Sequence, residues 1–187
     1  MLQKIIAFFQ GIIMAIASFF GLNFGITESV EIKPFGEIDN TKWSYNESAD
    51  VWWQAGLTYC ENPVDTTYQT LGIYVPGKYM TGEKNEDGYY TCALTNEAVE
   101  GYTAETAPVV MPVNTPGYSA MKAPTGFEKR ATEYTDAGFI YVNAGCRGRD
   151  HGAPAGVTDL KAAVRFIRLN NDIIAGCLLY TSPSPRD

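Results

Sequence analysis

The clearest pattern of hydrophobic and polar positions lies near the end of the chain, in the segment Gly138–Asn170. Phe139–Val142 is an uncharged apolar run, as is typical of a buried parallel strand. A glycine-rich turn follows, and apolar residues then recur at spacings of three and four. This spacing predicts an amphipathic helix whose apolar stripe contains Val157, Leu160, Val164 and Ile167.

The predicted helix has a start signal, because Thr158 or Asp159 can cap it and Pro154 lies just upstream. Strand, turn and helix are half of a β–α–β crossover, which needs a second parallel strand. The following segment, CLLYTSPSPRD, contains two prolines and does not fit a central strand. We therefore expect the natural domain to continue beyond Gly176. Residues 177–187 resemble translated sequencing-adaptor read-through on a metagenomic gene fragment, with a genuine disordered tail as the alternative.

Two earlier segments alternate with period two, which predicts antiparallel strands. The apolar positions are Trp53, Ala55, Leu57 and Tyr59 in the first segment, and Leu71, Ile73 and Val75 in the second. The charged segment Lys78–Gly88 is expected to be a mobile excursion. Tyr89–Leu94 is expected to form a further short strand.

Ala107–Asn114 is a continuous apolar run and predicts a buried strand. The Pro- and Gly-containing loop Thr115–Thr125 follows it. Gly126–Asp136 is compatible with a helix that places Phe127, Ala131 and Tyr134 on one side. The order of elements predicts an α/β fold, with an antiparallel start followed by parallel βα units.

The first 24 residues carry a single charge, Lys4. A signal peptide, an uncleaved membrane anchor and an amphipathic interfacial helix all fit this segment. Each interpretation predicts an exported protein, secreted or anchored at the cell surface. Residues 25–51 are polar and are expected to form a linker, so that the domain itself covers residues 52–176.

Composition and charge narrow the function classes. The chain has 187 residues, of which 45% are hydrophobic, enough for one domain. A net charge of -7 argues against nonspecific nucleic-acid binding. Five of the 14 basic residues lie in the C-terminal pattern, either as a solvated face or as a patch for an anionic group: Arg147, Arg149, Lys161, Arg165 and Arg168.

Cysteine and histidine offer few sites. The spacing of the cysteines fits no zinc motif, and we expect neither a metal nor a cofactor. Cys60 and Cys92 are either unpaired buried thiols or a disulfide of an exported protein. Cys146 precedes Arg147, which can acidify a thiol, although a structural role in the loop explains it equally simply. His151 is the one histidine, and it is either a loop residue or a substrate contact.

Other motifs are incomplete. Gly117–Met121, with Ser119, begins like G-x-S-x-G but lacks the second glycine. The glycines after Phe139–Val142 do not match G-x-G-x-x-G, so a dinucleotide site is not expected.

The segment YVNAGCRGRDHGAPAGVTDLKAAVRFIRLNNDIIAG resembles the part that precedes the nucleophile elbow in bacterial α/β-hydrolases of the tannase and feruloyl-esterase type. APVVMPVNTPGYSAM is similar to the strand and oxyanion loop of those proteins, and TLGIYVP to the strand before it. The resemblance covers residues 52–176. It implies the N-terminal part of an α/β-hydrolase sheet, truncated before the nucleophile elbow.

The same resemblance implies a serine esterase for small aromatic-acid esters of the galloyl or feruloyl kind. In such an enzyme a serine attacks the ester carbonyl, a histidine accepts its proton and an acid orients the histidine. One oxyanion donor would be the N–H of Gly117 or Tyr118, unless Pro116 and Gly117 form only a type II turn. Arg147 and His151 are candidate substrate contacts. The three catalytic residues are expected beyond Gly176, so the 187-residue chain should be inactive.

Two alternatives remain open from the sequence. The first keeps the fold and changes the substrate, giving a peptidase or a general carboxylesterase. The second is a membrane-tethered binding module without enzymatic activity, in which Trp43, Trp52 and Trp53 form an exposed aromatic surface. Buried tryptophans would argue against the second alternative.

Overall fold

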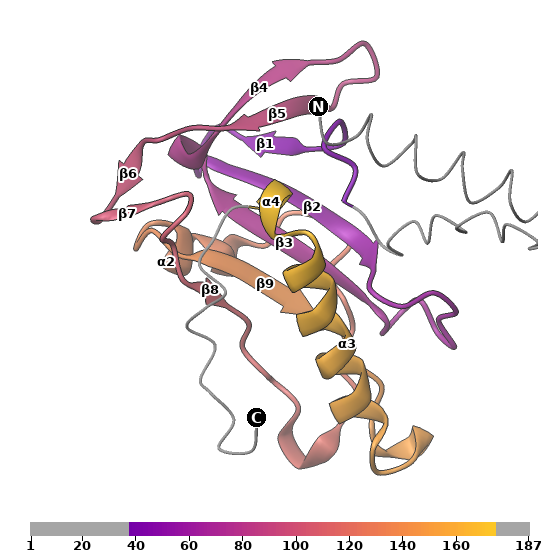
Figure 1. Cartoon of the computed structure of the whole chain (residues 1–187). Helices are drawn as coiled ribbons and strands as arrows, with labels where there is room; N and C mark the ends of the chain where they lie inside the picture. Colours follow the sequence, from indigo (N-terminus) through magenta and orange to yellow (C-terminus); the bar gives the residue numbers. More distant parts are fainter. Residues whose placement is uncertain (1–37, 175–187) are drawn as a thin grey trace, which may run out of the picture. The chain divides into compact units, whose positions relative to one another are not determined.

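The computed structural model describes residues 38–174, which form a mixed β-sheet with helical segments on both faces (Figure 1). The strands and helices, with η for a 3-10 helix, are β1 Ser44–Asn46, β2 Val51–Thr58, β3 Thr70–Pro76, η1 Gly77–Tyr79, β4 Met80–Lys84, β5 Tyr90–Leu94, β6 Ala98–Val99, β7 Tyr102–Thr103, β8 Val109–Val110, η2 Pro116–Tyr118, η3 Lys129–Ala131, α2 Thr132–Thr135, β9 Ile140–Ala144, η4 Arg149–His151, α3 Ala155–Leu169 and α4 Asn171–Ile174.

The main sheet has the strand order β1-β2-β3-β9-β8. Neighbours from β1 to β9 run antiparallel, and β8 pairs with β9 in parallel. The predicted antiparallel start and the parallel pair of strands are both present. Beside this sheet, β4 pairs with β5 and β6 with β7.

Period two places alternate residues of the central strands on opposite faces of the sheet. On one face, Leu71, Ile73 and Val75 pack with Phe166 and Ile167 of α3. The opposite face carries a smaller cluster of Val51, Tyr74, Ala131 and Tyr141, with Phe127 and Tyr134 packed against it. Strand β3 is buried along its whole length, whereas its alternating sequence predicts burial of one face only. The other face is covered as well, because the Tyr74 ring packs on Phe127 and Tyr141.

A register shift in β2 makes the predicted alternation wrong for half of this strand. The register with β3 shifts between Gln54 and Leu57, where Gly56 has φ +75°. Before the shift Trp52 faces α3, and after it Leu57 does. Trp53 therefore packs on the opposite face, where its ring lies 6.4 Å from that of Phe127.

The linker expected up to residue 51 is wrong for residues 38–51. Ile38 and Trp43 are both buried, and β1 pairs with β2. Trp43 and Trp52 are 0% and 6% exposed, so they do not form the exposed aromatic surface that a binding module would need.

The mobile excursion expected at Lys78–Gly88 is also wrong, because most of it forms η1 and β4. The β4–β5 pair packs closely on the core: a Cβ on Gly82 would stand 2.6 Å from the Trp52 ring. Tyr90–Leu94 forms β5, which confirms the strand expected there. Of the run Ala107–Asn114, only Val109–Val110 is a strand, since Pro108 and Pro112 have no N–H to donate to a ladder.

Cys60 and Cys92 are free thiols, so the disulfide is wrong. The segment 1–24, expected to be a signal peptide or membrane anchor, lies outside the described residues, as do residues 25–37 and the tail 177–187. Within residues 38–174, no helix is both long and apolar enough to cross a membrane.

Candidate functional site

The loop after β9 is packed so closely that two of its positions require glycine. A Cβ on Gly145 would stand 2.4 Å from the Tyr68 carbonyl oxygen, and one on Gly148 would stand 2.4 Å from the Ala120 nitrogen. Real Cβ atoms do not approach backbone atoms so closely. The glycine-rich turn is therefore a packing requirement, which fits its failure to match a dinucleotide motif.

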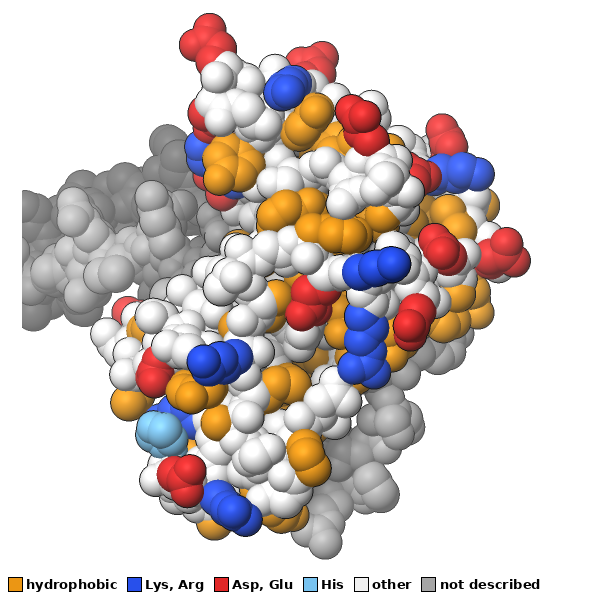
Figure 2. Space-filling model, turned by 180° about the vertical axis from the view of Figure 1, so that it is seen from behind, with side chains coloured by type: hydrophobic (Ala, Val, Ile, Leu, Met, Phe, Trp, Pro, Cys, Tyr) orange, Lys and Arg blue, Asp and Glu red, His pale blue; other side chains and the backbone are white. Residues whose placement is uncertain are grey.

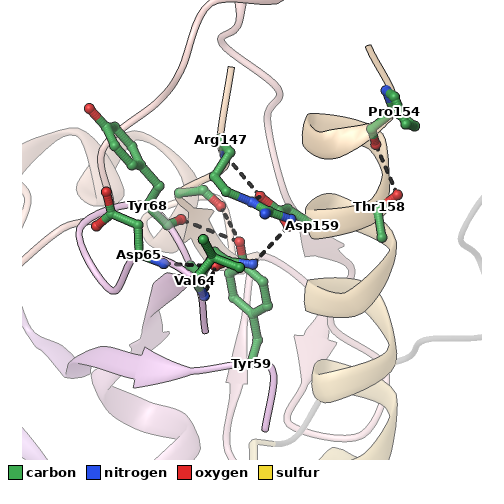
Figure 3. Close-up of polar contacts among 10 residues, drawn as sticks. Tyr59, Val64, Asp65, Tyr68, Arg147, Pro154, Thr158 and Asp159 are labelled. Carbon is green, nitrogen blue, oxygen red and sulfur yellow. Dashed lines mark hydrogen bonds and ion pairs between the residues drawn. The ribbon is translucent and has the colours of Figure 1, made fainter. Parts of the chain in front are cut away.

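An ion pair between Arg147 and Asp159 fixes this loop to α3 (Figure 3). The Arg147 Nε and Nη2 atoms donate to the two Asp159 carboxylate oxygens at 2.9 and 2.8 Å, and the Arg147 backbone N–H donates to the same carboxylate at 2.9 Å. The Asp159 side chain is 2% exposed. Its hydrogen bonds raise the pKa of the Arg147 guanidinium above the ordinary value. Arg147 is thereby held as a rigid cation at the strand end.

The same carboxylate is joined to the segment between β2 and β3. The Gln69 side-chain amide donates to Asp159 at 3.0 Å, and its carbonyl accepts the Val64 N–H at 2.6 Å. Tyr59 donates its hydroxyl hydrogen to the Gly145 carbonyl at 2.8 Å. Burial raises the pKa of the Tyr59 hydroxyl, so that it remains a donor. The network satisfies a buried charge with several hydrogen bonds, which a buried charge requires.

A second loop, after β8, lies beside the first. Met121 and Cys146 exchange two backbone hydrogen bonds, of 2.9 and 2.8 Å, which tie the two loops together. In η2, Gly117 and Tyr118 both have φ +61°, in the left-handed region. The Tyr118 N–H donates to the Thr115 carbonyl at 3.0 Å, so this amide is used within the turn. The Gly117 carbonyl accepts a hydrogen bond from Arg149 at 3.4 Å.

A cavity of about 110 Å³ lies between these loops and the start of α3. Its lining is largely apolar, with two arginines, and consists of Val113, Thr115, Tyr118, Ser119, Cys146, Arg147, Gly148, Arg149, Ala153, Gly156, Val157 and Leu160. The cavity lies next to the loops that follow β8 and β9, the parallel pair. In α/β sheets, ligands bind outside the carboxyl ends of such strands.

The candidate residues are only partly brought together. Arg147 and Tyr118 line the cavity and Gly117 is in the adjoining turn, whereas His151 is not among the lining residues. His151 lies in η4 and is exposed, visible as the pale blue side chain in Figure 2. None of the described residues that line the cavity is His, Asp or Glu, so Ser119 has no general base beside it there.

Two further hypotheses concern Cys146 and metals. Burial raises the pKa of the Cys146 thiol, which is opposite to the acidified nucleophile that its neighbouring arginines suggest. Cys146 therefore serves the structure of the loop. Within residues 38–174, no group of three or more His, Cys, Asp or Glu side chains is placed to hold a metal ion.

The assignment of the helix cap from the sequence is wrong, and the actual role of Asp159 was missed. The residue before the helix is Pro154, with no side-chain cap, and the Thr158 hydroxyl donates to the Pro154 carbonyl at 2.9 Å. Asp159 belongs to the buried face of α3, together with Ala155, Ala163, Phe166 and Ile167. The sequence contains one signal of this role: Asp159 lies four residues from Ala155 and four from Ala163, both on the buried face of the helix. Val157, expected to be buried, is 52% exposed.

Comparisons with known proteins show which fold this arrangement belongs to. No protein-family model and no curated protein matches the chain. Solved structures do match. The Fusobacterium nucleatum tannase is 28% identical, with a TM-score of 0.57, over 75% of this chain and 31% of that one. The Lactobacillus plantarum tannase is 25% identical, with a TM-score of 0.52, over 67% of this chain and 27% of that one.

A tannin acyl hydrolase in complex with 3,4-dihydroxybenzoate is 26% identical, with a TM-score of 0.52, over 67% of this chain and 28% of that one. This chain thus spans less than a third of the length of each of these three enzymes. The similarity confirms the family resemblance that the sequence indicates: the chain has the tannase-type fold.

Proposed function

We propose that this chain is part of a tannase-type esterase that hydrolyses small aromatic esters. The observation that carries the proposal is the structural match to tannases, which include complexes with 3,4-dihydroxybenzoate and with ethyl gallate. The apolar cavity after β8 and β9 supports it, because a phenolic ring needs apolar walls and a few fixed polar groups.

In this proposal, residues 38–174 supply the scaffold and one oxyanion donor. An ester carbonyl attacked by a serine develops negative charge on its oxygen, and backbone N–H groups stabilise that charge. Gly117 is our candidate for the donor, because the Tyr118 N–H is already bonded to Thr115. The left-handed turn, which favours glycine, fixes the direction of the Gly117 amide.

The nucleophile, the histidine and the acid would then lie in polypeptide outside residues 38–174. The serine forms an acyl-enzyme while the histidine takes its proton and passes it to the departing alcohol, and water then releases the aromatic acid. Arg147 is too firmly paired with Asp159 to act as an acid or base, so its proposed role is a fixed positive charge beside the substrate.

The direct test is release of gallate from methyl gallate by the 187-residue chain. We expect no turnover above the buffer rate. Turnover that Ser119→Ala abolishes would overturn the proposal, because the catalytic serine would then lie in η2 and its flanking loop.

A second test introduces Gly117→Ala into a longer protein, in which this chain is joined to the polypeptide proposed to carry the catalytic residues. Loss of a well-placed oxyanion donor lowers kcat by roughly 10²–10³-fold. Gly88→Ala is the matched control, since Gly88 also has a positive φ, and a Cβ at either position meets open space or an ordinary contact. Equal kcat values for the two variants would show that the Gly117 N–H does not stabilise the oxyanion.

We also propose export of the protein through residues 1–24. Cell fractionation of the full chain tests this proposal, with accumulation in the cytosol as the contrary result.

A further inference from the structure

The cavity between the loops after β8 and β9 contains two arginines whose charges are balanced differently. Both Arg147 and Arg149 line it. Arg147 is paired with the buried carboxylate of Asp159, so its charge is already balanced within the protein. Arg149 has no carboxylate of residues 38–174 within ion-pair distance. Among those residues its side chain makes one hydrogen bond, the 3.4 Å contact with the Gly117 carbonyl. The Arg149 charge is therefore available to a ligand.

The lining of the cavity carries no negative charge that would oppose an anion. None of the described residues that line it is Asp or Glu. Asp150, next to Arg149 in sequence, is exposed in η4 and is not part of the lining. The fixed charge of the lining is thus positive, which favours an anionic ligand. A guanidinium group presents its N–H donors in a planar fork, which matches the two oxygens of a carboxylate.

The rest of the lining suits an aromatic ring with small polar substituents. Val113, Val157 and Leu160 give the cavity apolar walls. Thr115 and Ser119 also line it, and within residues 38–174 their hydroxyls have no hydrogen-bond partner. Such hydroxyls can bond to phenolic hydroxyls. The volume of about 110 Å³ is well below the roughly 300–1,000 Å³ of sites for drug-sized ligands, so we expect a ligand with one ring.

The position of Arg149 beside the turn at Gly117 indicates which anion would bind. Arg149 donates to the Gly117 carbonyl, and a Cβ on Gly117 would stand 3.9 Å from the Arg149 Nη1 atom. The Gly117 amide is our candidate oxyanion donor, so the carbonyl carbon of a bound ester would lie close to Arg149. After hydrolysis that carbon belongs to the carboxylate of the aromatic acid. A carboxyl group with an ordinary pKa of about 4 is ionised at neutral pH.

We propose that the cavity binds the ionised product acid, with the Arg149 guanidinium on its carboxylate and the aromatic ring between the apolar walls. Arg149 makes the site selective for an aromatic carboxylate over the corresponding neutral ester, so the acid competes with the ester for the cavity. Arg147 contributes less to this selectivity, because Asp159 already balances its charge. The inference rests on the proposed function, which places the ester carbonyl beside Gly117.

The test compares the affinity of the 187-residue chain for 3,4-dihydroxybenzoate with that for its neutral methyl ester, by NMR titration. This acid belongs to the proposed class and is present in one of the matched structures. We expect the parent chain to bind the acid about tenfold more tightly than the ester, because hydrogen bonds between charged groups are the strong ones. Arg149→Gln should remove that preference. Arg130→Gln is the matched control, since Arg130 is an exposed arginine of η3 outside the cavity lining.

The proposal is overturned if the parent chain binds the acid no more tightly than the ester. It is also overturned if Arg149→Gln keeps the preference, or if Arg130→Gln loses it as well. Added sodium chloride provides a measurement that needs no variant. It should weaken binding of the acid and leave binding of the ester unchanged, because salt screens an exposed ion pair. Equal salt effects on the two ligands would contradict the proposal.

The outcomes separate this inference from the proposed function. A chain that prefers the acid, joined in a longer protein that releases no gallate from methyl gallate, leaves the carboxylate site standing and contradicts the proposed function. A longer protein that hydrolyses methyl gallate, built on a chain without preference for the acid, contradicts the carboxylate site alone.

Discussion

The two halves of the main sheet differ in how completely they are covered. In the antiparallel half, β3 is buried at every position and Trp52 lies under the β4–β5 hairpin. In the parallel half, β8 has only two residues in its ladder, and apolar side chains of α3 and its neighbours are half exposed. The first half is packed on both faces of the sheet, whereas the second has exposed apolar side chains next to the candidate cavity.

This difference suggests a division of roles between the two halves of the sheet, one for stability and one for the candidate site. The antiparallel half and the inner face of α3 hold the fold together. The parallel half positions two loops around a cavity and leaves apolar side chains exposed beside it. The ion pair of Arg147 and Asp159 ties the loop after β9 to α3, and Gln69 joins the same carboxylate to the segment between β2 and β3.

The largest effect is expected for Asp159→Ala, which removes the buried acceptor shared by Arg147 and Gln69. Breaking a buried ion pair by removing one partner typically costs about 3–5 kcal/mol. Urea unfolding measures the loss. Asp136→Ala is the control, since Asp136 is exposed, and it should change the free energy of unfolding little. Equal losses in the two variants would show that the network contributes no stability.

A similar loss is expected for Leu71→Ala in the antiparallel half. Leu71 is 0% exposed on β3, and truncation of a buried leucine to alanine costs about 2–5 kcal/mol. Thermal and urea unfolding provide the measurement. A loss smaller than that of Leu160→Ala would reverse the comparison between the halves.

Alkaline pH should lower the free energy of unfolding through Cys92, which lies in β5 of the β4–β5 hairpin beside the antiparallel half. Burial raises the pKa of the Cys92 thiol from 9.0 to about 12. Below pH 9 the thiol is protonated in both states; between pH 9 and 12 only the unfolded chain loses the proton, which favours unfolding. Stability should therefore fall across this window. Cys92→Ala should make the fall shallower, and an unchanged slope between the variant and the parent would contradict the assignment.

The smallest effect is expected for Leu160→Ala in α3. Leu160 is partly buried and packs against the main core, so its truncation should cost less than the about 2–5 kcal/mol usual at a fully buried leucine. Urea unfolding alongside Leu71→Ala tests this directly. A loss of the size expected for Leu71→Ala would mean that Leu160 is packed as fully as Leu71.

Local patterns were sufficient wherever a segment packs regularly. The alternation of Leu71, Ile73 and Val75 correctly gave β3, and the apolar run before the glycine-rich turn gave β9. The Pro116–Gly117 pair correctly indicated a tight turn in the loop after β8. In each case the residues themselves dictate the backbone conformation.

The predictions from sequence fail where contacts with residues distant along the chain determine the local structure. The register shift at Gly56 reverses the faces of β2, and no local alternation reveals it. The apolar residues of α3 extend beyond the face that meets the sheet, to the exposed Val157, so helical periodicity alone cannot tell which of them are buried. The spacing of Asp159 from Ala155 and Ala163 indicates that it lies on the buried face, but its partners Arg147 and Gln69 are placed around it by the fold and could not be predicted from the helix sequence.

The central claim is that the sheet is packed on both faces at β3 and is only partly covered at β8. Amide hydrogen exchange of β3 and β8 in the 187-residue chain tests it most directly. We expect the β3 amides to exchange slowly and the β8 amides to exchange fast. Amides of β8 that exchange as slowly as those of β3 would contradict the account.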